Sequence, residues 1–205
     1  MDDDIARALG AGDRAPACAT SALARAVAER ADREGLVDVA YAIHDSPLGP
    51  LLVAAADGGL VMVAYAATGA EAHLARLARE ISPRVVELPA RLDKARRELD
   101  EYFAGRRRRF EIPIDWRLVR GPFARAVLAR TAEIPFGGVR TYAQIAGAAG
   151  SPRGSRAAGN ALGSNPVPIV IPCHRVVRRG GALGGYTGGL ELKRFLLELE
   201  GRARS

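Results

Sequence analysis

Cysteine and histidine are scarce in this chain of 205 residues, which has two cysteines and three histidines. Cys18 and Cys173 lie far apart and belong to no CxxC pair, which excludes zinc knuckles and a disulfide framework. His44 and His73 have no cysteine or carboxylate at the spacing of metal ligands, so we interpret both as ordinary structural or surface residues. We therefore expect no metal site, and we interpret Cys18 as a bystander thiol.

Long apolar runs are also absent from the sequence. None approaches the roughly 18 residues that a membrane helix needs, and the first residues, MDDDIARALG, are acidic, unlike a signal peptide. These absences predict a soluble, cytoplasmic protein without a membrane partner, in which thiols stay reduced. The charges are unbalanced, since 30 Lys and Arg against 23 Asp and Glu give a formal net charge of +7. That excess favours a polyanionic partner without establishing one.

The first half of the chain predicts an N-terminal extension and then a small α+β domain. Residues 1–35 are rich in Ala, Arg, Asp and Glu and predict one modest helix, capped by Ser21 and stopped by Gly35, to which we assign no function. The next segment, residues 36–113, contains apolar runs separated by turn signals, which predict an antiparallel meander, and then two stretches of helical spacing. The runs cover 37–44, 51–56 and 60–65, and the helical stretches 71–81 and 90–105.

The second half, residues 117–205, predicts a mainly helical domain. The stretches TYAQIAGAAG and SRAAGNALGSN, joined by SPRG, have the arrangement of a helix-turn-helix. The second stretch has few bulky side chains, which suits either close approach to DNA or a tightly packed helix inside the protein. The fold class we expect is α+β, with an antiparallel sheet and helices first and a helix-turn-helix domain second.

Acidic residues are missing from Thr141 to Thr187, where five arginines stand. A surface that accepts phosphates must avoid carboxylates, so this stretch favours DNA binding. The five are Arg153, Arg156, Arg175, Arg178 and Arg179. The run Arg106–Arg109 could also grip phosphates, but a solvated loop at a domain junction is the commoner meaning of such a run.

The segment IPCHRVV places Cys173 directly beside His174. A thiolate is the reactive form of cysteine, and a histidine with nearby cations can lower the pKa of the thiol. In an extended segment the two side chains would point to opposite faces, so they cooperate only if the chain turns or a water bridges them. A relay would also need a third group to orient the imidazole. The last helix offers Glu191, Glu198 and Glu200, and spacing alone does not choose among them.

The ordered set NPVPIVIPCHRVV, TYAQIA, SRAAGNALGSN, GGYTGGLELK and LLELEG resembles the O6-alkylguanine-DNA alkyltransferase family, the methylated-DNA–protein-cysteine methyltransferases. The resemblance covers residues 117–201 strongly and 37–113 loosely. It implies that Cys173 accepts the alkyl group, that His174 deprotonates it through a water, and that Glu200 orients His174. It further implies that Tyr142 acts as an acid toward guanine N3, and that Asn165 braces the turn before the active-site segment.

The resemblance also implies which residues contact DNA and the base. Arg156 would enter the duplex and fill the gap left by the flipped base, with the second helix in the minor groove. Further DNA contacts would come from Thr141, Ser155, Ala157 and Gly159. The base pocket would be lined by Pro168, Val176, Tyr186 and Thr187. Where relatives often carry serine, this chain has Thr187, which suggests a slightly narrower pocket.

The activity that the resemblance implies is a stoichiometric, irreversible transfer from O6-alkylguanine, and from O4-alkylthymine, to the cysteine. We expect no cofactor, a double-stranded DNA partner that carries alkylated guanine, and a monomer in solution; cooperativity on DNA and the role of Arg175 stay open. Two alternatives remain. A helix-turn-helix regulator would use Cys173 only as a sensor, and a cysteine hydrolase would turn over many times.

Overall fold

The computed structural model describes the backbone of residues 17–201 and the side chains of residues 22–201, so the side chain of Cys18 lies outside the described part. The chain forms two compact units, one ending at Val37 and one beginning at Asp38. In the first unit, helix α2 covers Ala17–Arg33. The predicted cap at Ser21 is wrong, because the helix begins four residues earlier. The predicted stop is confirmed by Gly35, whose φ of 70° is left-handed.

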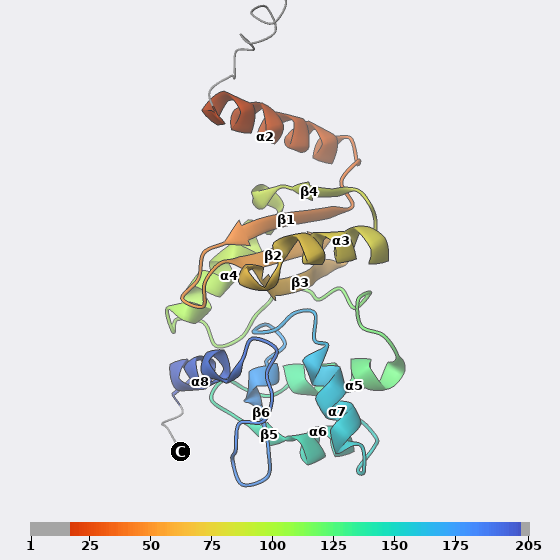
Figure 1. Cartoon of the computed structure of the whole chain (residues 1–205), viewed down its shortest axis with the longest axis vertical. Helices are drawn as coiled ribbons and strands as arrows, with labels where there is room; N and C mark the ends of the chain where they lie inside the picture. Colours follow the sequence, from red (N-terminus) through yellow and green to blue (C-terminus); the bar gives the residue numbers. More distant parts are fainter. Residues whose placement is uncertain (1–16, 202–205) are drawn as a thin grey trace, which may run out of the picture. The chain divides into compact units, whose positions relative to one another are not determined.

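The second unit opens with a four-stranded sheet in the order β3-β2-β1-β4 (Figure 1). The predicted meander is confirmed by β1 (Val39–His44), β2 (Leu51–Ala56) and β3 (Gly59–Tyr65), which pair antiparallel. A fourth strand, β4 (Val85–Glu87), pairs parallel with β1 and was not predicted. Three residues are too few to display the alternation that reveals a strand.

Both faces of this sheet are buried, which explains why β2 is apolar at every position. Leu52 and Ala54 face a cluster that includes Leu77 of α3 (Ala70–Glu80), whereas Leu51 and Val53 face the main core. On that second face lies α4 (Asp93–Phe103), which follows the short 3-10 helix η2 (Pro89–Leu92). The sheet is therefore packed on both faces. The hydrophobic core on its second face also includes residues from the rest of the chain.

The rest of the chain is mainly helical, as predicted. Helices α5, α6 and α7 pack against one another (Figure 1), and a two-residue parallel pair of strands, β5 with β6, was not predicted. Helix α6 begins with a capping box, in which the Thr141 hydroxyl accepts from the Gln144 N–H at 3.2 Å. The bounds are α5 Pro122–Ala132, β5 Arg140–Thr141, α6 Tyr142–Ala148, α7 Ser155–Gly163, η3 Cys173–Arg175, β6 Val176–Val177 and α8 Leu190–Leu199.

The sheet and the helical part share one hydrophobic core. That core runs from Leu51 and Leu99 to Val127, Ile145 and Leu196. The backbone also links the two parts, since the N–H of Val63 donates to the carbonyl of Pro166 at 2.9 Å. The division into domains 36–113 and 117–205 therefore stays a prediction, because residues from Asp38 onward form one compact unit. Within the described residues, no helix combines the length and apolarity needed to cross a bilayer.

Candidate active site

Cys173 begins a 3-10 turn, η3, which directly follows Pro172. The chain therefore turns between Cys173 and His174, the condition under which neighbouring side chains can serve one site. Their environments nevertheless differ, because Cys173 lines a cavity while His174 is fully buried. No hydrogen bond joins the two side chains in the described part of the structure; the Cys173 sulfur instead accepts from Asn165 Nδ2 at 3.2 Å.

Asn165 holds the segment that leads to this turn. Its Nδ2 also donates to the carbonyl of Ile171 at 2.9 Å, and its Oδ1 accepts from the N–H of Val167 at 3.0 Å. Between these anchors Ile169 has a φ of 75°, a left-handed conformation that a β-branched residue rarely adopts. The side chain of Ile169 is fully buried, so packing and the Asn165 bonds together hold the strained loop.

His174 is bonded to Glu200, the residue that directly follows α8. Its Nε2 lies 2.9 Å from Glu200 Oε1, and both side chains are buried. Glu200 also forms a bidentate ion pair with Arg175, whose Nη2 lies 2.8 Å from Oε1 and whose Nε lies 2.9 Å from Oε2. Arg175 additionally donates from Nη1 to the carbonyl of Ile134 at 2.5 Å. The charge of Arg175 is thus structural and faces no phosphate.

Two further donors reach Glu200 from other parts of the fold. The hydroxyl of Tyr102, on α4, donates to Oε1 at 2.7 Å, and the N–H of Gly137 donates to Oε2 at 3.1 Å. Burial alone would raise the pKa of Glu200, but the bonds from His174 and Arg175 lower it to about 2. Glu200 is therefore a fixed carboxylate.

The carboxylate fixes the tautomer of His174. An ionised carboxylate only accepts, so Nε2 carries the proton and Nδ1 keeps a free lone pair. Nδ1 is buried, and no described residue of the protein forms a hydrogen bond to it. Burial lowers the pKa of His174 although Glu200 opposes the shift, and burial raises the pKa of the Cys173 thiol although Asn165 and Lys193 oppose it. The resting site therefore holds a neutral thiol beside a neutral imidazole whose Nδ1 lone pair can accept a proton.

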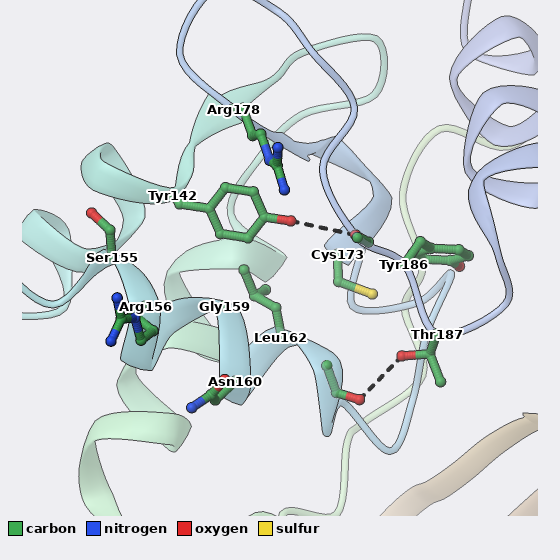
Figure 2. Close-up of a pocket in the computed structure, with 12 residues that line it drawn as sticks. Tyr142, Ser155, Arg156, Gly159, Asn160, Leu162, Cys173, Arg178, Tyr186 and Thr187 are labelled. Atoms are coloured by element: carbon green, nitrogen blue, oxygen red, sulfur yellow. Dashed lines mark hydrogen bonds between the residues drawn. The ribbon is translucent and has the colours of Figure 1, made fainter.

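Cys173 lies in a cavity of about 740 Å³ between α7 and the loop before α8. Figure 2 shows its sulfur between Tyr142 on one side and Tyr186 with Thr187 on the other. The cavity is large enough for a nucleobase, and many of its lining residues have small side chains. The lining consists of Tyr142, Ser155, Arg156, Gly159, Asn160, Leu162, Gly163, Cys173, Arg178, Gly185, Tyr186 and Thr187.

Tyr142 stands at the wall of this cavity. Its hydroxyl donates to the carbonyl of Gly185 at 3.3 Å (Figure 2). Burial raises the pKa of Tyr142, which keeps the phenol protonated and able to donate. Gly184 must be glycine here, since its φ is 67° and a Cβ would lie 2.9 Å from the Tyr142 hydroxyl oxygen.

Lys193, on α8, holds the loop that closes the cavity. Its side chain is fully buried, and Nζ donates to the carbonyls of Val176, at 2.6 Å, and of Leu183. Burial lowers the pKa of Lys193 to about 8. The ammonium is thus balanced by carbonyl oxygens and by no carboxylate, which keeps positive charge next to the cysteine.

The opposite wall is fixed by two hydroxyl groups. Thr187 Oγ1 donates to the carbonyl of Gly163 at 3.1 Å, which ties the loop to the end of α7 (Figure 2). Tyr186 shares a hydrogen bond of 2.8 Å with Tyr65, which ends β3 in the sheet. The threonine that replaces the expected serine therefore uses its hydroxyl to fasten the wall.

Four of the five predicted DNA-contact residues lie on α7, and three of these, Ser155, Arg156 and Gly159, line the cavity. Arg156 and Ala157 are exposed, and Ser155 and Gly159 are half-buried, whereas Ala158 and Ala161 are buried against the neighbouring helices. The small residues of α7 therefore fit both interpretations. Ala158 and Ala161 allow tight packing against the neighbouring helices, and Ala157 and Gly159 leave the other side of the helix accessible. In the described chain, no ion pair engages the exposed arginines near the cavity, namely Arg140, Arg153, Arg156, Arg178 and Arg179.

Apart from Ala157, Asn165, His174 and Glu200, three more predicted residues lie outside the cavity lining. Thr141 uses its hydroxyl to cap α6. Pro168 lines a neighbouring cavity of about 250 Å³, shared with Thr187. Val176 has a fully buried side chain, and its carbonyl accepts from Lys193.

Sequence reasoning missed Tyr65, Tyr102 and Lys193. The two tyrosines precede the motif by many residues, so no local spacing indicates them. Lys193 lies within GGYTGGLELK, but nothing in that segment shows that its side chain turns inward.

The arginine run at residues 106–109 lies at the junction between sheet and helices. Arg107 pairs with Glu101 at 2.8 Å and approaches Glu98 at 3.6 Å. Arg108 lies over the ring of Phe136 at 5.8 Å, and Arg175 lies over the same ring at 5.9 Å. These two residues of the run thus have contacts within the protein. Across the described residues, no group of three or more His, Cys, Asp or Glu could hold a metal ion.

Comparisons with known proteins agree with this geometry. The ribonuclease-like domain of 6-O-methylguanine DNA methyltransferase matches residues 39–116, and the DNA-binding domain of the same protein matches residues 122–202. A methylated-DNA–protein-cysteine methyltransferase of Methanosarcina acetivorans is 38% identical over 161 residues, which are 78% of this chain and 97% of that protein.

Solved structures give the same result. The O6-methylguanine methyltransferase of Mycobacterium tuberculosis matches with a TM-score of 0.68 and 36% identity, over 82% of this chain and 96% of the other. The OGT of the same organism in complex with DNA matches with a TM-score of 0.64 and 35% identity, over 79% and 91%. The family models cover both the sheet and the helical part with the cysteine-bearing turn. The chain therefore belongs to the 6-O-methylguanine DNA methyltransferase family.

Proposed function

We propose that this protein repairs DNA by moving an alkyl group from guanine O6 to the sulfur of Cys173, once per molecule. One observation carries the proposal: the cysteine lies in a base-sized cavity, beside a histidine whose Nε2 is bonded to Glu200, and α7 with its exposed arginine borders that cavity. Related proteins are named for this reaction, and one is solved with DNA.

The chemistry is an in-line displacement at the alkyl carbon. As the bond between sulfur and carbon forms, the bond between carbon and O6 breaks, and its electron pair goes to the guanine. The thiol proton passes through a water to Nδ1 of His174, while Tyr142 donates its phenolic proton to N3 of the departing base. The imidazolium then returns a proton to the tyrosinate, and the proton on N3 exchanges through water for one on N1, so the net products are an alkylated cysteine and an ordinary guanine.

The neutral resting state supports this order of events. Burial disfavours both the thiolate and the imidazolium, so charge separation is delayed until the base enters and supplies the leaving group. Glu200 then stabilises the imidazolium as it forms, because its own charge is permanent. Lys193 adds a positive charge near the sulfur.

Access to the cavity requires the base to leave the helical stack, since a mostly buried sulfur cannot reach O6 within a duplex. When the base leaves the stack, it leaves a gap in the duplex. We propose that this gap is filled by the side chain of Arg156, which is exposed at the start of α7 and borders the cavity. Ala157 and Gly163, also exposed on this helix, allow close contact with the minor groove. The whole site lies within one chain, consistent with action as a monomer on double-stranded DNA.

The product explains why the protein acts once. Hydrolysis of a thioether would have to expel a thiolate from an unactivated carbon, and thiolate is a poor leaving group there, so Cys173 stays alkylated. O4-alkylthymine presents a similar alkyl ether on a smaller base, and we include it among the substrates.

The test is intact mass after incubation with duplex DNA that carries O6-methylguanine. The expected result is a gain of one methyl group per protein and no more, retained in Cys18→Ala and lost in Cys173→Ala. Because Cys18 is the only other cysteine, the pair of variants locates the acceptor. Tight binding with unchanged mass would refute repair and favour a regulator with a sensor cysteine. Repeated turnover would instead favour a hydrolase.

A further inference from the structure

Tyr102 is a buried tyrosine of α4 whose hydroxyl reaches the carboxylate behind the active site. Its side chain is fully buried, and its ring contacts the rings of Phe103, Phe110 and Phe136 at centroid distances of 5.4, 5.4 and 6.1 Å. The hydroxyl donates to Oε1 of Glu200 at 2.7 Å. Thus the part of the chain before residue 113 contributes an atom to the relay that begins at Cys173.

The oxygen that Tyr102 contacts is the one that orients His174. Glu200 Oε1 accepts from three side chains: from Tyr102 at 2.7 Å, from Nε2 of His174 at 2.9 Å, and from Arg175, whose Nη2 lies at 2.8 Å and whose Nε lies at 3.2 Å. Oε2 accepts from Arg175 Nε and from the N–H of Gly137. Lys193, on α8, also acts on His174 through its charge. An oxygen that accepts from three side chains attracts each of them less than an oxygen that accepts from two.

We propose that Tyr102 is a positioning residue of the relay, whose hydroxyl fixes Oε1 of Glu200 and limits the pull of that oxygen on the imidazole. The proposal rests on the proposed function, in which His174 must be neutral to receive the thiol proton. Without the hydroxyl, Oε1 would bond Nε2–H more strongly and favour the imidazolium. That imidazolium has no free Nδ1 lone pair, so it cannot act as the base.

The surroundings of Tyr102 separate this role from simple packing. Its ring lies among phenylalanine rings, an environment that a phenylalanine at 102 would satisfy equally well. The hydroxyl is the only part of the Tyr102 side chain that requires a polar partner, and Glu200 is that partner. Burial and the negative charge of Glu200 raise the pKa of Tyr102, so the phenol remains a donor at every pH at which the protein works.

The test compares Tyr102→Phe with Tyr65→Phe. Both variants lose one buried tyrosine hydroxyl that bonds across to the helical part, but Tyr65 bonds Tyr186 and does not touch Glu200. The first measurement is the Nε2 proton resonance of His174 by NMR, assigned with His174→Gln in a protein that has three histidines. We expect this resonance to move to lower field in Tyr102→Phe and to stay in place in Tyr65→Phe.

The second measurement is the pH profile of methyl transfer. The acid side of the profile, where the protonated imidazole stops the reaction, should move up by about 0.5 to 1 pH unit in Tyr102→Phe. A hydrogen bond to a charged group corresponds to about 1 to 2 pH units, and only part of the lost bond is transferred to the imidazole. Tyr65→Phe should keep the wild-type midpoint. Site-specific 3,5-difluorotyrosine at 102, a stronger donor of similar size, should move both readouts the opposite way.

Several outcomes would overturn the proposal. Unchanged resonance and midpoint in Tyr102→Phe, with only a uniformly lower rate or melting temperature, would make Tyr102 a packing residue. An equal shift in Tyr65→Phe would make the effect a general loosening of the junction. If Tyr102→Phe does not fold, the difluorotyrosine protein decides, and no shift there rejects the proposal. If wild-type protein accepts no methyl group, the proposed function fails, whereas the Nε2 resonance still decides the role of Tyr102.

Discussion

Replacing Glu200 by glutamine should make the protein less stable at neutral pH and less sensitive to acid. In the wild type, Glu200 is a buried carboxylate bonded to His174, Arg175 and Tyr102. Glutamine keeps the shape but removes the charge, so Arg175 is left as a buried cation without a counterion. Breaking one side of a buried ion pair in this way typically costs about 3 to 5 kcal/mol.

The pH dependence follows from the depressed pKa of Glu200, about 2 in the folded state against an ordinary value of 4.5. A lowered pKa means that the folded state binds the proton less readily than the unfolded chain. The resulting stability is complete above pH 4.5 and is lost as the pH falls toward 2. The full contribution is about 3 kcal/mol, of which about 2 kcal/mol disappears between pH 7 and pH 3.

Urea denaturation at pH 7, 5, 4 and 3 measures this contribution. Other carboxylates with lowered pKa values, Asp38 and Asp115 among them, also release stability in acid, so the quantity of interest is the difference between wild type and Glu200→Gln. That difference should shrink by about 2 kcal/mol from pH 7 to pH 3.

A double-mutant cycle with Arg175→Met provides the control. If the two residues form a coupled pair, the double variant should lose less stability than the sum of the single variants, by at least about 2 kcal/mol. A difference between wild type and Glu200→Gln that is below about 1 kcal/mol at pH 7 and independent of pH would refute the buried ion pair as described.

Three further predictions concern the transfer reaction. Arg156→Ala should slow methyl transfer from duplex DNA at least tenfold more than transfer from free O6-benzylguanine, because only the duplex needs the flipped base replaced; equal losses in single-turnover assays would remove that role. Tyr142→Phe should slow transfer from both substrates by about 10²-fold, as expected for loss of a general acid, and wild-type rates would reject the assignment. Gly184→Ala should lower the rate on both substrates and destabilise the protein by about 1 kcal/mol, since its φ is positive and its Cβ meets the Tyr142 hydroxyl; a crystal structure with Tyr142 unmoved and rates unchanged would contradict this.

Much of the fold was predictable because its signals are local. The three meander strands and the six helices beyond residue 65 each carry their own apolar period or turn residues, so the sequence indicates them without reference to distant parts. The two-residue strands at Arg140–Thr141 and Val176–Val177 carry no such period, and they exist only because tertiary packing brings the segments together. The same reason applies to β4.

The site was predictable to the extent that it follows a motif. Cys173 and His174 stand out by rarity, but the residues alone left three glutamates open, and the family resemblance selected Glu200. The structure brings Glu200 to His174, with Oε1 of the carboxylate 2.9 Å from Nε2 of the imidazole. The role of Tyr102 could not be predicted from the sequence, because its contact with Glu200 spans 98 positions and depends on how α4 packs against the helical part.

The 3-10 geometry of η3 explains how three adjacent residues perform different tasks. With three residues per turn, successive side chains point about 120° apart. Cys173 thus faces the cavity, while His174 and Arg175 reach Glu200 from different directions. In a strand, Cys173 and Arg175 would share one face, and the guanidinium would lie beside the thiol. It would then promote a permanent thiolate, exposed to oxidation before any damaged base arrives. In the 3-10 turn, the guanidinium of Arg175 instead pairs with the carboxylate of Glu200, and the thiol of Cys173 stays neutral.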